Sequence, residues 1–96
     1  MLYLKNNLAK EEKETRREEF KIIADILSLA SRPINKTHIM YKANLSFTQL
    51  ERYLRRVLSC GLLEQKNSPI TYQITEKGKR FLKIYHQMMQ ILYSEQ

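Results

Sequence analysis

The chain has little of what marks a secreted, membrane or metal-binding protein. Only one of its 96 residues is cysteine, so an internal disulfide is excluded, which fits a reducing cytoplasm. No apolar run approaches the roughly 20 residues of a membrane-spanning helix, and no signal peptide is visible. With 43% hydrophobic and 28% charged residues, the composition is that of a folded domain. We therefore expect one cytoplasmic domain with a single hydrophobic core and no membrane partner.

Residues that carry catalysis or bind metal ions are also scarce. His38 and His86 lie far apart in the sequence and have no Cys or carboxylate at ligand spacing. There is no Gly-rich phosphate loop, nucleophile elbow or paired carboxylate site. Cys60 ends a predicted helix and is expected to be a small buried residue rather than a thiol sensor. We predict no enzyme activity, no metal site and no cofactor.

The net charge of +7 is concentrated in the middle of the chain. Residues 1–31 carry six Lys/Arg and six Asp/Glu, and residues 81–96 carry one of each. Residues 32–80 carry ten basic and three acidic residues. A surface that binds a polyanion requires positive charge concentrated in one region. The alternative is that the positive charge serves only solubility, which does not require it to be concentrated.

The N-terminal third contains one clear helix. Residues 1–14 form an extension with a mixed-charge run, which is either helical or disordered. The Thr15-x-x-Glu18 capping box favours a helix that begins at Arg16. Pro33 restricts the residue before it and so ends this helix. The core-facing stripe consists of Phe20, Ile23, Ile26, Leu27 and Ala30.

Two helices joined by a tight turn follow. The first is predicted over residues 36–42, and Asn44 suits the left-handed backbone of the corner after it. Ser46 and Gln49 have the spacing of a capping box that opens the second helix. Its apolar side carries Leu50, Leu54, Val57 and Leu58, and its other side carries Thr48, Arg52, Arg55, Arg56 and Ser59. This pattern is typical of a helix-turn-helix.

A short hairpin is predicted directly after the second helix. Gly61 is a natural helix stop, and residues 62–66 and 70–74 have the composition of strands around a turn at 67–69. Ile34 is either a small third strand or a packed loop residue. A hairpin in this place is the wing of a winged helix, so the fold class is mainly α with a small β-hairpin.

The last helix is predicted over residues 76–93, with Thr75 as its cap and Gly78 in the first turn, where close packing under the hairpin is possible. Residues 15–75 would form the winged helix-turn-helix domain and 76–96 a dimerisation helix. Its seam comprises Phe81, Tyr85, Met88, Met89 and Leu92. The alternative is that the helix folds back onto the first helix or the N-terminal segment.

Four segments of the chain follow a pattern shared by one group of proteins. They are His38-Ile-Met-Tyr-Lys-Ala-Asn-Leu-Ser-Phe, Tyr53-Leu, Gly61-Leu-Leu-Glu and Tyr72-Gln-Ile-Thr-Glu-Lys-Gly78. Together they resemble the small archaeal winged-helix DNA-binding proteins, which include chromatin-associated dimers and predicted transcriptional regulators. The resemblance covers roughly residues 20–93. It implies a winged helix dimerised through its last helix, with two DNA-binding units that face outward.

The second helix of the helix-turn-helix is the predicted major-groove element. Its first turn, at Ser46, Phe47, Thr48 and Gln49, presents backbone N–H groups that favour a phosphate. Gln49 suits adenine, and Phe47 or the Thr48 methyl group suits a thymine methyl group. Arg52, about one turn further on, is the candidate for guanine or a groove-wall phosphate. An ordinary exposed helix surface is the alternative interpretation.

The remaining contacts are predicted to hold the DNA backbone. Tyr41 either donates its hydroxyl to a phosphate or packs against the second helix. The other predicted backbone contacts are Arg55, Arg56, Lys36, Thr37 and the flanking Arg32. The wing tip at Lys66, Asn67 and Ser68 is predicted to enter the minor groove instead. We expect a homodimeric transcriptional regulator that binds double-stranded DNA. The alternatives are a general chromatin protein without sequence preference, a protein-interaction module of the transcription machinery, and a ligand-responsive repressor.

Overall fold

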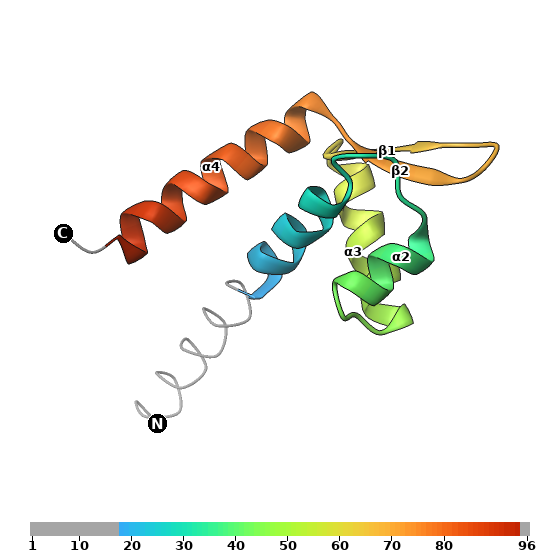
Figure 1. Cartoon of the computed structure of the whole chain (residues 1–96), viewed down its shortest axis with the longest axis horizontal. Helices are drawn as coiled ribbons and strands as arrows, with labels where there is room; N and C mark the ends of the chain where they lie inside the picture. Colours follow the sequence, from blue (N-terminus) through green and yellow to red (C-terminus); the bar gives the residue numbers. More distant parts are fainter. Residues whose placement is uncertain (1–17, 95–96) are drawn as a thin grey trace, which may run out of the picture.

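A computed structural model describes residues 18–94, which form helices and a two-stranded hairpin that projects from one side of them (Figure 1). Residues 18–29 of the N-terminal helix are described. They are followed by α2 (Lys36–Lys42), α3 (Phe47–Ser59), β1 (Leu63–Lys66), β2 (Thr71–Ile74) and α4 (Glu76–Tyr93). The predicted extension at 1–14 and the predicted helix start at Arg16 lie outside the described residues. The winged-helix architecture is confirmed. In the described part, no helix is long and apolar enough to cross a membrane.

Local sequence signals set the corner between α2 and α3. The Asn35 side chain caps α2 by accepting a hydrogen bond of 2.9 Å from the His38 N–H. Asn44 adopts φ 55°, the left-handed conformation predicted for it. The Ser46 hydroxyl accepts a hydrogen bond from the Gln49 N–H at 3.2 Å, and the Gln49 side chain accepts one from the Ser46 N–H at 3.0 Å. This confirms the predicted capping box, which aligns the start of α3.

The core lies between the N-terminal helix, α2, α3 and the hairpin. Its largest fully buried side chains are Ile26, Leu27, Ile39, Leu50 and Val57, each of which stabilises the fold by about 2 kcal/mol through burial. Tyr53, which the predicted apolar stripe omits, is buried as well. The prediction for Phe20 was wrong, because this residue lies beyond the end of the core and is 42% exposed. The prediction for Cys60 was also wrong, since it is the exposed C-cap residue of α3.

The hairpin pairs β1 with β2 in antiparallel register, from Leu63 opposite Ile74 to Lys66 opposite Thr71. Its tip extends away from the helices, as Figure 1 shows on the right. Ile34 adds a single bridge to Tyr72 through two backbone hydrogen bonds of 3.0 and 2.8 Å. The two alternatives for Ile34 are therefore both partly right, because it pairs with the sheet and packs against the core.

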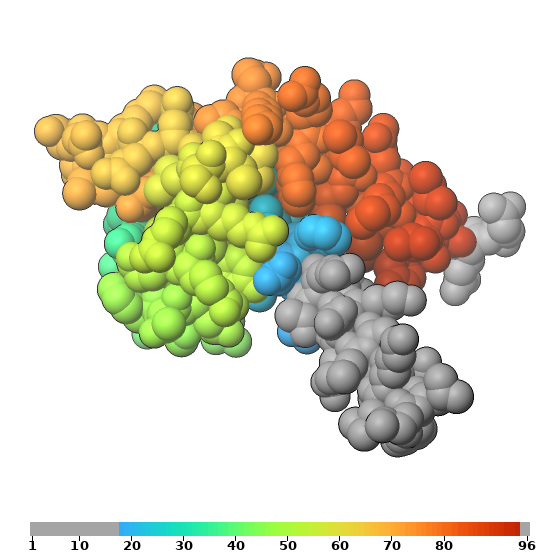
Figure 2. Space-filling view, turned by 180° about the vertical axis from the view of Figure 1, so that it is seen from behind, coloured from blue at the N-terminus to red at the C-terminus, as the bar shows by residue number. Residues whose placement is uncertain are grey.

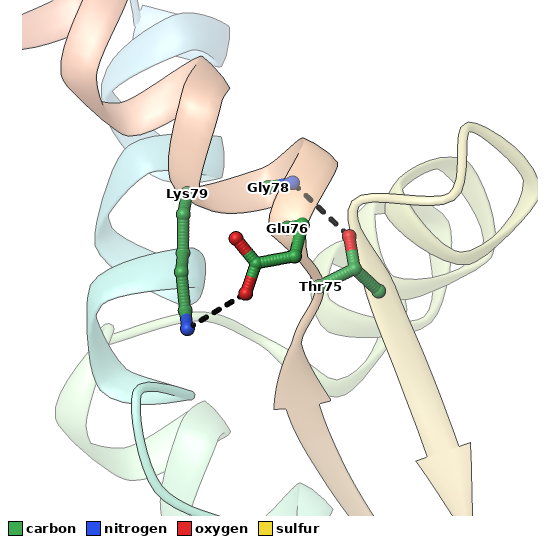
Figure 3. A network of polar contacts seen from close by, with 4 residues as sticks. All are labelled: Thr75, Glu76, Gly78 and Lys79. Carbon is green, nitrogen blue, oxygen red and sulfur yellow. Dashed lines mark hydrogen bonds and ion pairs between the residues drawn. The ribbon is translucent and has the colours of Figure 1, made fainter.

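A glycine in the first turn of α4 allows this helix to pack closely against the hairpin. Thr75 caps the helix by accepting a 3.0 Å hydrogen bond from the Gly78 N–H (Figure 3). Gly78 is buried, and a Cβ atom there would collide with the Leu62 carbonyl oxygen and lie 2.6 Å from Ile74 Cγ1. The predicted close packing at this position is thus present. It fixes the direction in which α4 leaves the domain.

The apolar surface of α4 is divided along its length. Phe81 and Leu82 pack against the core, and the Tyr85 ring stacks on Phe81 with a centroid distance of 6.4 Å. Beyond this point the helix passes the end of the core. The exposed apolar side chains beyond Tyr85 are Met88, Ile91, Leu92 and Tyr93, and Ile84 just before Tyr85 is exposed as well. Only the second half of the predicted seam is therefore free to meet another surface.

Candidate nucleic-acid interface

One side of α3 is exposed along its whole length. Thr48, Arg52, Arg55 and Ser59 recur at steps of four, three and four residues and are all exposed, opposite the buried Leu50 and Val57. The guanidinium of Arg52 lies 5.1 Å from the centroid of the Tyr53 ring. Such a cation–π contact limits the freedom of the arginine without neutralising it. The result is a straight, positively charged ridge on a helix that is anchored in the core.

In the first turn of α3, fewer polar groups are available to bind DNA than the sequence pattern indicates. The Gln49 side-chain oxygen and the Ser46 hydroxyl are both engaged in the capping box. A bidentate pair between glutamine and adenine needs that same oxygen as an acceptor and the amide N–H as a donor. Gln49 therefore has only its amide donors free unless the cap opens, while the adjacent Phe47 and Thr48 side chains are exposed.

A three-residue cluster joins α2 to the start of α3. The Lys36 ammonium donates a hydrogen bond to the Glu51 carboxylate and lies 5.9 Å from the centroid of the Phe47 ring. The hydrogen bond to Glu51 raises the pKa of Lys36, so this lysine remains fully charged near neutral pH. Its charge is nevertheless compensated by Glu51. This pairing makes Lys36 a weaker candidate for the predicted contact with a DNA phosphate.

The positive charge of Arg56 is also compensated by a carboxylate. Its guanidinium lies 3.4 Å from the Glu19 carboxylate of the N-terminal helix. The two predicted backbone arginines of α3 therefore differ, because Arg55 belongs to the exposed ridge and Arg56 lies at the flank beside the N-terminal helix.

The other predicted contact residues lie at the surface. Tyr41 is 81% exposed and does not pack against α3, which leaves its hydroxyl accessible. Arg32 and Thr37 are exposed, and so are the wing-tip residues Lys66, Asn67 and Ser68. Figure 2 shows α3 and the wing on one face of the molecule. The predicted set is thus divided between a central ridge, the α2 surface and the wing tip.

Contacts from the start of α4 hold the far end of α3. The Lys77 ammonium donates a 2.7 Å hydrogen bond to the Cys60 carbonyl oxygen, and the Thr75 hydroxyl donates one of 2.6 Å to the Gly61 carbonyl oxygen. A cation beside the carbonyl end of a helix is favourable because of the helix dipole. The orientation of α3 is therefore set by α4 as well as by the core.

The sequence prediction missed several surface residues of α4. Lys79, Arg80 and Lys83 are exposed on its outer side, and Ile84 and Ile91 are 59% and 80% exposed on its apolar side. The spacing of these residues was visible in the sequence. It was overlooked because the whole helix was assigned to dimerisation through one seam.

Comparison with known proteins places this geometry in a family. The sequence profile of a family described as winged helix-turn-helix matches residues 16–92. An uncharacterised protein of the archaeon Methanocaldococcus jannaschii is 27% identical over 81 residues, which cover 83% of this chain and 81% of that protein.

Solved structures show the same arrangement. Sso10a-2, a DNA-binding protein from Sulfolobus solfataricus, superposes with a TM-score of 0.69 at 30% identity over 78% of this chain and 84% of its own. A putative transcriptional regulator from Pseudomonas aeruginosa has a TM-score of 0.56 at 10% identity, with 99% and 81% of the two chains covered. The multiple antibiotic-resistance repressor MarR from Listeria monocytogenes has a TM-score of 0.56 at 14% identity, with 98% and 79% covered. The last two similarities show the fold alone.

Proposed function

Because the chain belongs to the winged helix-turn-helix family, we propose that it binds double-stranded DNA, with α3 in the major groove and the wing against the adjacent backbone. The observation that carries this proposal is the exposed ridge of Thr48, Arg52, Arg55 and Ser59 on a helix held by the core. The DNA-binding protein Sso10a-2, which is 30% identical and shares the arrangement, supports it.

The ridge suggests a division of roles along α3. Arg52 is centred on the exposed side and is oriented by Tyr53, so it is the residue we assign to a base edge or a groove-wall phosphate. Arg55, one turn further along, and Arg56 at the flank are assigned to phosphates, which fix the position of the protein without reading sequence. Phe47 and Thr48, exposed in the first turn, are the candidates for contact with a thymine methyl group.

The Glu51→Gln substitution is expected to strengthen DNA binding about two- to fivefold at low salt. It removes a carboxylate from the DNA-facing surface and releases the charge of Lys36 for a phosphate. Fluorescence anisotropy with a labelled duplex measures the change. The matched control is Glu64→Gln, which removes an exposed carboxylate from β1 without freeing a lysine. Equal gains for the two variants would mean that only net charge matters.

We further propose that the chain acts as a homodimer formed through the second half of α4. The exposed apolar residues there include Met88 at 39% and Leu92 at 63%, and such a stripe on a helix that passes beyond its own core suits a two-helix contact. Two outward-facing α3 helices would then engage two segments of one duplex.

Met88→Lys is expected to convert the dimer into monomers at tens of micromolar chain, because it places a charge in the centre of that apolar surface. Sedimentation equilibrium gives the mass. Gln90→Lys is the control, since it adds the same charge to the polar side of the same turn and is expected to leave the mass unchanged. A monomeric unmodified chain at this concentration would refute the dimer.

A gel shift with duplex DNA at low salt tests binding itself, and the absence of any shift would favour a protein-interaction role instead. Selection of bound sequences from a pool of random duplexes then separates the two kinds of DNA-binding protein. Enrichment of a motif with two half-sites indicates a transcriptional regulator. Tight binding without enrichment indicates a general DNA-packaging protein.

A further inference from the structure

The outer side of α4 carries a basic stripe that the proposed contacts of α3 and the wing do not use. Lys79, Arg80 and Lys83 are all exposed and follow one another at steps of one and three residues. Together with Glu76 and Lys77 they line a surface depression of about 410 Å³. We call Lys79, Arg80 and Lys83 the α4 stripe. It lies on the polar side of the helix, away from Phe81 and Leu82, which pack against the core.

The charges of the α4 stripe are mostly uncompensated. Lys79 pairs with Glu76 at 3.2 Å (Figure 3), but among residues 18–94 neither Arg80 nor Lys83 has an ion-pair partner. Like charges three and four residues apart on a helix repel one another by a few tenths of a kcal/mol per pair. The stripe therefore costs helix stability, and bound anions would remove that cost.

The stripe begins where α3 ends. Lys77, two residues before the stripe, donates a hydrogen bond to the carbonyl oxygen of Cys60, the C-cap residue of α3. In Figure 2 the start of α4, in orange, lies directly above α3 on the same face of the molecule. The N-terminal end of the stripe is thus close to the C-terminal end of α3. The apolar residues Met88 and Leu92 belong to the distal half of α4, so a dimer contact there leaves the stripe accessible.

We propose that the α4 stripe is a second DNA-backbone contact, which binds phosphates of the same duplex that flank the segment held by α3. This inference rests on the proposed DNA binding. Lysine and arginine in this arrangement neutralise phosphates and make no distinction between bases. The stripe would lengthen the bound segment and raise affinity for long duplexes, while sequence discrimination remains with α3.

The test compares two variants that lower the net charge equally. Arg80→Ala/Lys83→Ala removes the stripe, and Ala favours the helix at both positions. Gln90→Glu/Ser94→Glu keeps the stripe and places the same change in charge at the exposed far end of α4. Both are titrated with duplexes of about 12 and about 30 base pairs, of which the shorter spans little more than one helical turn. Circular dichroism verifies that each variant is folded.

On the long duplex, the stripe variant is expected to bind at least tenfold more weakly than the control variant, and its salt slope is expected to fall by about two per chain. On the short duplex the two variants are expected to bind alike. An equal loss on both duplexes, or no difference from the control, would overturn the inference. The inference would also be overturned if the stripe variant lost only the ability to join two separate duplexes, which co-sedimentation of long DNA measures. If the unmodified chain binds neither duplex, the proposed function itself fails.

Discussion

Replacement of Gly78 by alanine is expected to destabilise the domain by about 2–3 kcal/mol, which lowers the melting temperature by about 10–20 °C. The new Cβ atom would collide with the Leu62 carbonyl oxygen, which also accepts a 3.1 Å hydrogen bond from the Thr75 N–H. Relief of the collision must move either α4 or the backbone at Leu62, directly before β1, and strain that bond. The gain of about 1 kcal/mol in helix propensity on replacing glycine by alanine is too small to offset this. Differential scanning calorimetry gives the change.

The only other glycine of the chain provides the control. Gly61 has a φ of 75°, but its Cβ position is open, with Lys77 Cδ at 3.9 Å as the nearest side-chain atom. Gly61→Ala is therefore expected to cost only about 1 kcal/mol through backbone strain. Our account of how α4 is seated would be wrong if Gly78→Ala were as stable as the unmodified chain or lost no more than Gly61→Ala.

The double substitution Arg52→Ala/Arg55→Ala is expected to weaken DNA binding at least 100-fold. Both guanidinium groups belong to the exposed ridge, and neither is paired with a carboxylate within residues 18–94. Loss of one such contact typically costs about 1–3 kcal/mol of binding free energy, and in a dimer each loss occurs twice. Anisotropy titrations at a fixed salt concentration measure the affinity.

Gln90→Glu/Ser94→Glu is again the charge-matched control, because it also lowers the net charge by two but leaves the ridge intact. We expect this control to bind within a few-fold of the unmodified chain, since exposed charges far from the contact are screened by salt. A similar loss of affinity in the two double variants would exclude α3 as the principal DNA-binding element and would point to a general effect of net charge.

Local signals in the sequence were sufficient for the helix-turn-helix and the wing. The cap residue Ser46, its partner Gln49 and the left-handed Asn44 act over a few residues, so their effect on the backbone could be predicted. The predicted hairpin strands were each one residue too long at their start. Strand ends depend on pairing with the partner strand, which composition does not specify.

The features that were mispredicted depend on neighbours distant in sequence. Phe20 continues the apolar stripe of the N-terminal helix, but the core ends before it. Cys60 follows a buried stripe, yet α3 ends there in an exposed turn. Periodicity identifies the side of a helix that faces inward. It does not show where along the helix the neighbouring elements that bury this side come to an end.

The exposed side of α3 was predicted from the sequence, but the ion pairs of its charged residues were not. The exposed side of α3 follows from helical spacing. The pairing of Lys36 with Glu51 and of Arg56 with Glu19 joins residues from different helices and depends on how those helices pack. The same tertiary contacts decide which cations remain available for phosphates. Arg52 was already the principal candidate from the sequence, whereas the preference for Arg55 over Arg56 came only with the structure.

The salt dependence of binding to duplex DNA tests the central claim most directly. If about five to eight phosphates are engaged across a dimer, the logarithm of the binding constant is expected to fall against the logarithm of salt concentration with a slope of roughly −5 to −7. The titration requires only the unmodified chain and one labelled duplex. A binding constant that stays flat between low and moderate salt would contradict the account, because the basic ridge of α3 would then not be neutralising DNA phosphates.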